Sequence, residues 1–175
     1  LEVKGVLTIV NTDITTLLWS SAGDKMPVGR RSASYAVAAV ALLEHVVPAD
    51  VNLVTSLPNP IALEVAESVT GWTMFTPSLR NIRQGGLEEL ASAVDAMSMN
   101  STEWRGLAEG EGVRTRCPLV VVTRGEEGAA VSFRDTAGNL CWTDVPAATL
   151  EQGVVDANHA GEAFTAGFLG ALLEE

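Results

Sequence analysis

Hydrophobic and polar positions divide the chain into a short opening part and a longer part with regular alternation. Residues 3–20 alternate and are rich in β-branched residues, and a turn-prone NTD sequence at 11–13 interrupts them. This pattern predicts a β-hairpin. A loop rich in Gly, Pro and charge is expected at 22–31. The apolar stretch at 33–46 predicts a mostly buried helix or two short elements.

From residue 50 onward, short apolar runs alternate with segments of helical periodicity. The predicted strands lie at 52–57, 72–77, 95–99 and 118–125, and the predicted helices lie at 60–71, 82–94 and 101–109. Strands that alternate with helices through short connections form a parallel sheet covered by helices. The sequence therefore predicts an α/β layered domain over residues 50–175.

The pattern changes after residue 125. Two strand-like segments, 128–134 and 140–146, flank a DTAGN turn, which predicts an antiparallel hairpin. The chain closes with a short strand and a tight turn that lead into an amphipathic helix reaching the last residue. Doubly wound sheets usually bind their ligand at the carboxyl ends of the parallel strands. Candidate site residues are therefore sought at those ends.

Length and charge narrow the classes of function. The 175 residues carry a net charge of −11, with 11 Lys and Arg against 22 Asp and Glu. Phosphodiester backbones and anionic lipids repel such a chain, so we expect neither nucleic-acid nor membrane partners. The sequence holds no run of about 18 apolar residues that would predict a transmembrane helix. A single domain, residues 1–175, is the default at this length.

Cysteine usage indicates a reducing compartment. Cys117 and Cys141 lie 24 residues apart, and the chain holds two His. This spacing suggests neither a disulfide framework nor a zinc site, so we expect free thiols and a cytoplasmic protein. The chain begins with neither Met nor a signal-peptide pattern. The numbering is therefore expected to begin inside a longer protein or after processing.

Residues 156–169 contain the strongest candidate for chemistry. The turn His159-Ala160-Gly161 leads into a helix with Glu162 in its first turn. A helix start presents unpaired N–H groups and a partial positive charge, so it can hold a phosphate or a developing oxyanion. A carboxylate there could accept a proton from an attacking hydroxyl. The alternative is structural, because an acid in the first turn stabilises any helix.

Four segments at predicted strand ends match known motifs in order. VVDANHAGEAFTAGFLGALL is similar to D-T-x-G-A-G-D-x-F-x-x-G, and VVVTRGEEGAAVSF to a T-x-G-x-x-G strand and turn. NSTE at 100–103 matches N-x-x-E, and TPSLR at 76–80 is similar to D-P-N-x-R. Together they resemble the ribokinase-like (PfkB) carbohydrate kinases. The resemblance implies a three-layer α/β/α fold with a mostly parallel central sheet, a nucleotide-binding core in residues 50–175 and a small lid-like hairpin within 1–32.

The resemblance also implies a role for each matching residue. Glu103 matches the residue that organises Mg²⁺ near the ATP phosphates. Ala160 and Gly161, with His159 beside them, match the anion hole, and Glu162 stands where the family has its catalytic Asp. The remaining matches belong to the nucleotide site, and they are Thr123, Gly125, Gly128, Asn100, Asp156 and Asn158.

The function implied by the resemblance is ATP-dependent, Mg²⁺-dependent phosphoryl transfer to a hydroxyl of a sugar or related small molecule. Such a reaction needs positioning, charge neutralisation and a base for the hydroxyl rather than covalent chemistry from the protein. Family members often pair through their lid strands, so a homodimer through the opening hairpin is expected as an option. The sequence does not identify the sugar.

Departures from the family pattern support an alternative function. His159 replaces the first Gly of G-A-G-D, and its Cβ occupies space through which backbone N–H groups approach phosphate. Glu162 is one methylene longer than Asp, and a misplacement of about 1 Å can cost 100-fold in rate. Thr76 and Ser78 replace the usual Asp and Asn. The alternative is a catalytically inactive pseudo-kinase that serves as a binding or assembly protein.

Two further expectations concern what the sequence lacks. The family's N-terminal sugar-binding half and the segment that closes over adenine have no counterpart here. If the 175 residues were the entire molecule, the sugar pocket and part of the adenine pocket would be missing. A dinucleotide-dependent oxidoreductase is excluded, because no G-x-G-x-x-G turn follows a first strand.

Overall fold

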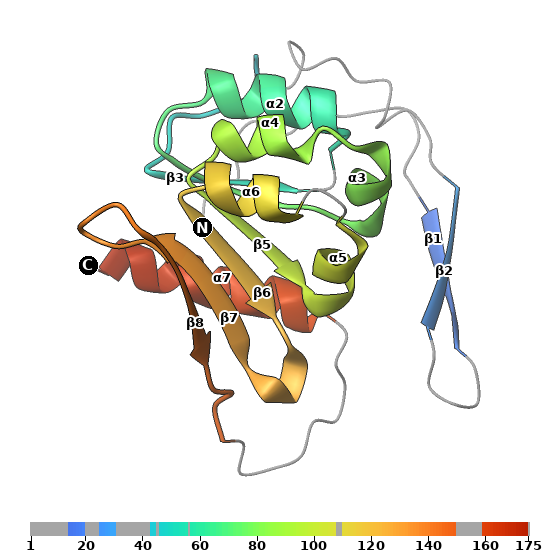
Figure 1. Cartoon of the computed structure of the whole chain (residues 1–175). Helices are drawn as coiled ribbons and strands as arrows, with labels where there is room; N and C mark the ends of the chain where they lie inside the picture. Colours follow the sequence, from blue (N-terminus) through green and yellow to red (C-terminus); the bar gives the residue numbers. More distant parts are fainter. Residues whose placement is uncertain are drawn as a thin grey trace. The chain divides into compact units, whose positions relative to one another are not determined.

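In the computed structural model, the described residues are 14–19, 25–30, 43–44, 46–55, 57–107, 110–149 and 159–174. The chain divides into two units, residues 1–47 and residues 48–175. In the first unit, β1 (Ile14–Trp19) pairs with β2 (Lys25–Arg30) in an antiparallel hairpin (Figure 1). The predicted strand at 3–10 and turn at 11–13 lie outside the described residues, as does nearly all of the predicted helix at 33–46.

The predicted loop at 22–31 is wrong over Lys25–Arg30, which forms a strand. The prediction gave weight to Pro27 and Gly29, which usually interrupt strands. A strand of a two-stranded ribbon tolerates Pro, because one of its edges needs no N–H for pairing. Here Pro27 lies opposite Leu17, and the register continues on both sides of it.

The second unit is built on a six-stranded sheet in the order β3-β4-β5-β6-β7-β8. The first four strands are parallel, and β7 and β8 are antiparallel to their neighbours. The bounds are β3 (Val51–Thr55), β4 (Trp72–Thr76), β5 (Ala96–Asn100), β6 (Leu119–Thr123), β7 (Ala129–Arg134) and β8 (Leu140–Val145). The predicted parallel sheet and carboxyl-terminal hairpin are confirmed.

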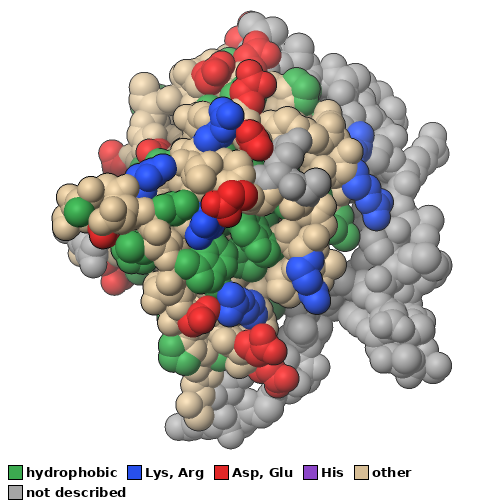
Figure 2. Space-filling view, viewed as in Figure 1, with side chains coloured by type: hydrophobic (Ala, Val, Ile, Leu, Met, Phe, Trp, Pro, Cys, Tyr) green, Lys and Arg blue, Asp and Glu red, His purple; other side chains and the backbone are tan. Residues whose placement is uncertain are grey.

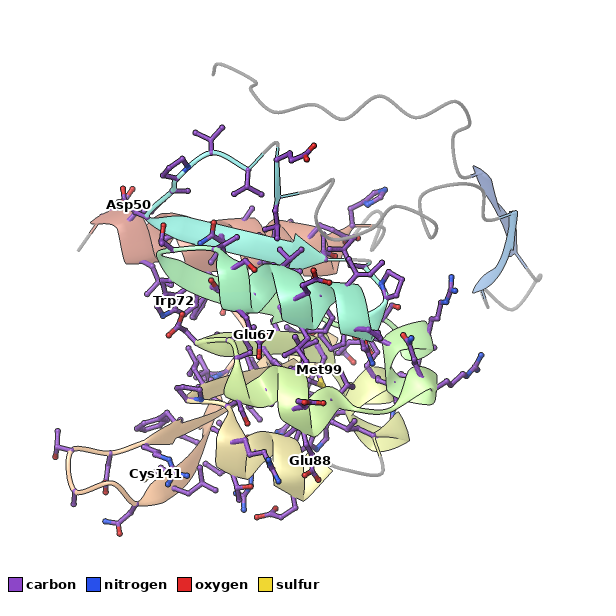
Figure 3. The ribbon with its side chains drawn as sticks, turned by 90° about the horizontal axis from the view of Figure 1, so that it is seen from above. Asp50, Glu67, Trp72, Glu88, Met99 and Cys141 are labelled. Atoms are coloured by element: carbon purple, nitrogen blue, oxygen red, sulfur yellow. The ribbon has the colours of Figure 1, made fainter. Side chains whose placement is uncertain are left out.

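Helices cover both faces of this sheet. The helices are α2 (Asn59–Ser68), α3 (Leu79–Gln84), α4 (Leu87–Ser92), α5 (Ser101–Gly106), α6 (Gly110–Arg116) and α7 (Ala160–Glu174). Figures 1 and 3 show α2, α4 and α6 side by side on one face and α7 on the other. The three-layer α/β/α arrangement predicted from the sequence is therefore confirmed.

The core lies between the sheet and its helices. Met74 and Phe75 of β4 and Met97 of β5 are fully buried, and Phe75 and Met97 are register partners. Burying one such side chain stabilises the fold by about 1.5–3 kcal/mol. Trp72 lies on the same face of β4 as Met74, and its ring lies 6.4 Å from the ring of Phe168 in α7.

Two helices differ from the prediction. The expected helix at 82–94 is divided into α3 and α4, because Gly85 and Gly86 between them both have φ of +76°, which a helix does not allow. The short helix α6 has no counterpart in the predicted elements. Its two glycines lower its helix propensity, and burial of Val113 against its surroundings stabilises it instead.

The surface carries charged side chains of both signs. Acidic and basic side chains are interspersed over the helix-covered face shown in Figure 2. Within the described part of the chain, no helix has the length and hydropathy needed to cross a membrane.

Candidate active site

The carboxyl ends of β5 and β6 bring two predicted site residues together. Asn100 and Thr123 are register partners at the last positions of these strands. The Thr123 hydroxyl donates a hydrogen bond of 3.5 Å to the carbonyl of Met99. Motifs that lie more than twenty residues apart in the sequence thus meet at one edge of the sheet, as predicted.

Asn100 ends β5 and begins α5 through a capping box. Its Oδ1 accepts hydrogen bonds of 2.9 Å from the backbone N–H groups of Thr102 and Glu103. In return, Glu103 Oε2 accepts a 2.8 Å hydrogen bond from the N–H of Asn100. This reciprocal pattern satisfies the free N–H groups at a helix start. Asn100 therefore positions the Glu103 carboxylate, whose Oε1 is not part of the capping box.

The Glu103 carboxylate lies in a half-buried, negatively charged environment. Burial raises its pKa, the hydrogen bond from Asn100 N–H opposes this, and the negative charge of Glu162 raises the pKa further. Glu162 belongs to α7, which packs against β5. Figure 1 shows α7 starting on the side of the sheet edge where α5 lies. The predicted metal residue and the predicted base thus lie near each other.

This pair of carboxylates fits a divalent cation. Mg²⁺ prefers hard oxygen ligands and usually keeps several of its waters. A cation beside Glu103 and Glu162 would offset both the burial and the repulsion that raise the pKa of Glu103. Among the described residues, no group of three or more His, Cys, Asp or Glu could hold a metal ion. Mg²⁺ would therefore depend on waters and phosphate oxygens for its other ligands.

The loop after β6 is shaped by two glycines. Gly125 begins the 3₁₀ turn η2 (Gly125–Glu127) with φ of +62°, and Gly128 ends it with φ of +87°. A Cβ at Gly128 would collide with the carbonyl oxygen of Val145, whereas nothing lies within 4 Å of a Cβ built at Gly125. The space beside the backbone of Gly125 is therefore open.

Arg124 connects the same loop to the neighbouring hairpin. Its N–H donates a 2.7 Å hydrogen bond to the carbonyl of Gly128. Its Nη1 forms an ion pair of 2.8 Å with Asp144 Oδ1 of β8. Arg124 was not among the predicted site residues. The predicted pairing of the two hairpin strands is the signal that could have indicated it, because this pairing brings Asp144 to the same end of the sheet.

The start of α7 carries the other predicted site residues. His159 precedes the helix with φ of +59°, and among the described residues it is the only non-glycine residue with positive φ. The matching motif position is Gly, so the backbone has the conformation that glycine favours although the residue is His. His is one of the few residue types enriched in this region. The backbone thus accepts His at position 159, and its side chain lies at the start of α7.

His159 also contacts the predicted base. Its Nδ1 lies 3.8 Å from Oε1 of Glu162, and the two side chains are 85% and 77% exposed. Ala163 N–H donates a 2.9 Å hydrogen bond to the carbonyl of His159. Helix geometry therefore leaves the N–H groups of Ala160, Gly161 and Glu162 without intrahelical acceptors. Nothing lies within 4 Å of a Cβ built at Gly161, so this first turn is accessible.

Some predicted site residues fall elsewhere. Asp156 and Asn158 lie outside the described residues. Ser78, at the end of β4, is the N-cap of α3, and its hydroxyl donates a 2.7 Å hydrogen bond to Asn81 Oδ1. The TPSLR segment lies at the end of β4, as predicted, and it also contains the start of α3, which the sequence pattern had placed at residue 82.

A buried amide pair near these strand ends escaped the sequence analysis. Asn81 Nδ2 donates hydrogen bonds of 2.7 Å to Asn59 Oδ1 and to the carbonyl of Leu57. Asn59 Nδ2 donates a 2.8 Å bond back to the carbonyl of Asn81. The pair holds together the loops that follow β3 and β4. The S-x-x-N spacing of Ser78 and Asn81 was the available signal.

The described residues also form an open depression of about 380 Å³, lined by Pro48, Ala49, Asp50, Thr70 and Gly71. It lies at the amino ends of β3 and β4, where Figure 3 labels Asp50 and Trp72. Among the described site residues predicted from the sequence, Asn100, Thr123 and Glu103 lie at the carboxyl ends of β5 and β6 instead. The depression is therefore separate from the candidate active site.

Comparisons with known proteins agree with this geometry. The chain matches the pfkB family carbohydrate kinase model over residues 30–175. No curated protein sequence matches the chain. Ribokinase from Thermotoga maritima is similar in structure, with 20% identity over 93% of this chain and 57% of that chain and a TM-score of 0.70.

Two other solved structures contain ligands. Nucleoside kinase from Burkholderia thailandensis in complex with inosine is 16% identical over 90% of this chain and 53% of its own, with a TM-score of 0.72. Ribokinase from Arabidopsis thaliana complexed with ribose and ATP is 22% identical over 91% of this chain and 56% of its own, with a TM-score of 0.61. The chain spans little more than half the length of these structures.

Proposed function

The chain belongs to the pfkB family of carbohydrate kinases, and on this basis we propose that it transfers a phosphoryl group from ATP to a hydroxyl of a sugar or a nucleoside. The observation that carries the proposal is that Glu103, held by Asn100 at the end of β5, interacts electrostatically with Glu162 at the exposed start of α7. Similar structures bind ribose with ATP, or inosine. Both ligands carry hydroxyl groups of the kind that the reaction requires.

Glu162 is the proposed general base. Its carboxylate is exposed at the start of α7, so a bound hydroxyl can reach it. The N–H groups of Ala160 and Gly161 in the same turn lack intrahelical acceptors, and they can donate to the oxygens of a phosphoryl group in transfer. Base and anion hole thus come from a single helix turn, which fixes their relative positions.

Thr123, Gly125 and Gly128 are proposed to line the nucleotide. The open backbone at Gly125 lets polyphosphate approach, and Gly128 keeps the loop against the chain after β8. Glu103, positioned by Asn100, would hold Mg²⁺ together with its waters. When bound with ATP, Mg²⁺ supplies neutralisation of the phosphate charge. Asp156 and Asn158 stay in the proposal as nucleotide-site residues on their motif positions.

The test measures ADP release with ribose, other pentoses, hexoses, inosine and other nucleosides as acceptors. Glu162→Gln is expected to abolish turnover and to leave ATP affinity, measured by calorimetry with and without Mg²⁺, within about twofold. Glu174→Gln, at the exposed far end of α7, is the matched control and is expected to keep wild-type turnover. Equal turnover by wild type and Glu162→Gln would exclude Glu162 as the base.

A pseudo-kinase is the second candidate function. The observation that favours it is the His159 side chain at the start of α7, where the family motif has Gly. It predicts that the double variant His159→Gly with Glu162→Asp, which restores the motif, gains little activity. Robust acceptor phosphorylation by this double variant, starting from an inactive wild type, would contradict a purely structural role.

The family resemblance also supports a homodimer paired through β1 and β2, and a cytoplasmic location. Free thiols at Cys117 and Cys141 suit a reducing compartment. Light scattering of the purified protein over a range of concentrations tests the dimer. A constant mass equal to one chain would contradict it.

A further inference from the structure

Two residues that depart from the family motif contact each other. His159 precedes the first residue of α7, and Glu162 is the third residue of that helix. Nδ1 of His159 lies 3.8 Å from Oε1 of Glu162. Their spacing is that of an N-cap residue and the N3 residue that folds back to it. The contact therefore follows from how a helix starts, and it needs both longer side chains.

The charges around Glu162 act from two elements. Glu103 on α5 bears the like charge whose interaction with Glu162 raises the pKa of Glu103. This repulsion favours positions of the Glu162 carboxylate farther from α5. His159 favours a position over the first turn of α7. The repulsion by Glu103 and the contact with His159 therefore both favour positions of the Glu162 carboxylate near the first turn of α7, which presents the free N–H groups.

The extra methylene of Glu162 makes such restriction useful. Glu has one more rotatable bond than Asp, and most of this side chain is exposed to solvent. An unrestrained carboxylate would sample several positions. Restricting it to one of them when it accepts the proton of a hydroxyl would then cost side-chain entropy. We infer that His159 is a positioning residue for Glu162, so that the two departures from the motif compensate for each other. This inference rests on the proposed function.

The catalytic test is a double-mutant cycle in the intact protein. His159→Gly suits a backbone with φ of +59°, so it is expected to preserve the fold. It should lower kcat about three- to tenfold, with KM for ATP within twofold of wild type. In the Glu162→Asp background, where the shorter carboxylate has less freedom, the same change should alter kcat less than twofold. Equal losses in both backgrounds would overturn the inference.

His159→Asn separates pairing from backbone rigidity. Asn also tolerates the left-handed conformation, but it lacks the imidazole. If His159 positions Glu162 through its ring, His159→Asn should lose as much kcat as His159→Gly. Recovery of wild-type kcat in His159→Asn would show that the backbone alone matters, and the positioning role would be rejected.

A readout independent of turnover keeps this inference distinct from the proposed function. Nitrogen NMR resolves the ring signals of the two His residues of the sequence. Glu162→Gln is expected to shift the Nδ1 signal of His159, whereas Glu174→Gln should leave it unchanged. Absence of a His159 shift would overturn the inference. A His159 shift in a protein that transfers no phosphoryl group would reject the proposed function alone and leave the contact between His159 and Glu162 supported.

Discussion

Glu103 of α5 and Glu162 of α7 interact electrostatically although they lie 59 positions apart in the chain. Burial raises the pKa of Glu103, and the charge of Glu162 raises it further. Both effects disfavour the charged form of Glu103 relative to a carboxyl group in water. The raised pKa of Glu103 is thus a property of the protein without any ligand, and its effect on stability can be measured.

Replacing Glu103 by Gln should raise the stability of the ligand-free protein at neutral pH. A raised folded-state pKa favours folding at low pH, and this advantage is lost as the pH rises through the folded pKa. Gln keeps the capping acceptor without the charge. We expect the melting temperature of Glu103→Gln to exceed that of wild type by about 1–3 °C at pH 7, with the difference vanishing below the ordinary Glu pKa.

Glu111→Gln provides a control of opposite sign. The hydrogen bond from Arg114 lowers the pKa of Glu111. A lowered folded-state pKa contributes stability above the unfolded pKa, which is lost as the pH falls through the folded pKa. This variant should therefore be slightly less stable than wild type at pH 7 and equal to it in acid. If the stability of both variants relative to wild type changed in the same direction with pH, the electrostatic assignment would be contradicted.

Alanine at Gly128 should destabilise the protein more than alanine at Gly125. Both positions have positive φ, which costs about 1–2 kcal/mol for a residue with a Cβ. At Gly128 the Cβ also collides with the backbone of Val145 and Ala147. We expect losses of about 2–4 kcal/mol for Gly128→Ala and 1–2 for Gly125→Ala in urea denaturation. Equal losses would show that the loop moves to accept the extra atom.

Asn81→Ala should be among the more damaging polar substitutions. The Asn81 side chain is 3% exposed and links the loops after β3 and β4 through Asn59 and Leu57. Its loss leaves buried partners unsatisfied, at a cost of about 2–4 kcal/mol. Asn139→Ala removes an exposed bond to Asp135, and less than 1 kcal/mol is expected. Chemical denaturation of both variants compares them directly, and a similar small loss in each would contradict the buried network.

The two cysteines should differ in reactivity. Burial raises the pKa of the Cys117 thiol to about 12, so it holds almost no thiolate at pH 8. Cys141 is partly exposed at the edge strand β8. A thiol reagent should therefore modify about one thiol per native chain, and both in denaturant. Cys141→Ser should remove the fast phase, whereas a fast reaction of Cys117 in that variant would contradict its burial.

The sheet could be predicted because its signals are local. Apolar runs such as Leu119–Thr123 fall at regular intervals, and each became a strand. The break between α3 and α4 was missed because apolar residues recur on both sides of Gly85 and Gly86, and this pattern does not show that both glycines have positive φ. The pattern of apolar residues alone does not reveal where the backbone changes direction between two helices on the same face of the sheet.

Only part of the candidate site could be predicted from the sequence. Motif positions placed Asn100 and Thr123 at neighbouring strand ends, and their register confirms this. The approach of Glu162 to Glu103 depends on how α7 crosses the second face of the sheet, which the contact between Trp72 and Phe168 helps to set. Such a long-range packing angle has no signature in a single sequence. The functional roles of these residues stay predictions.

The sheet order has a consequence for how the protein is made. From β3 to β8, each new strand is added beside the one synthesised just before it, so pairing can follow the ribosome without waiting for distant segments. Helix α7 is the last described element and packs on the face opposite α2, α4 and α6. A nascent chain would therefore hold the Trp72 side of its sheet without this helix until residues 160–174 have been synthesised. During that interval chaperones have an apolar surface to protect.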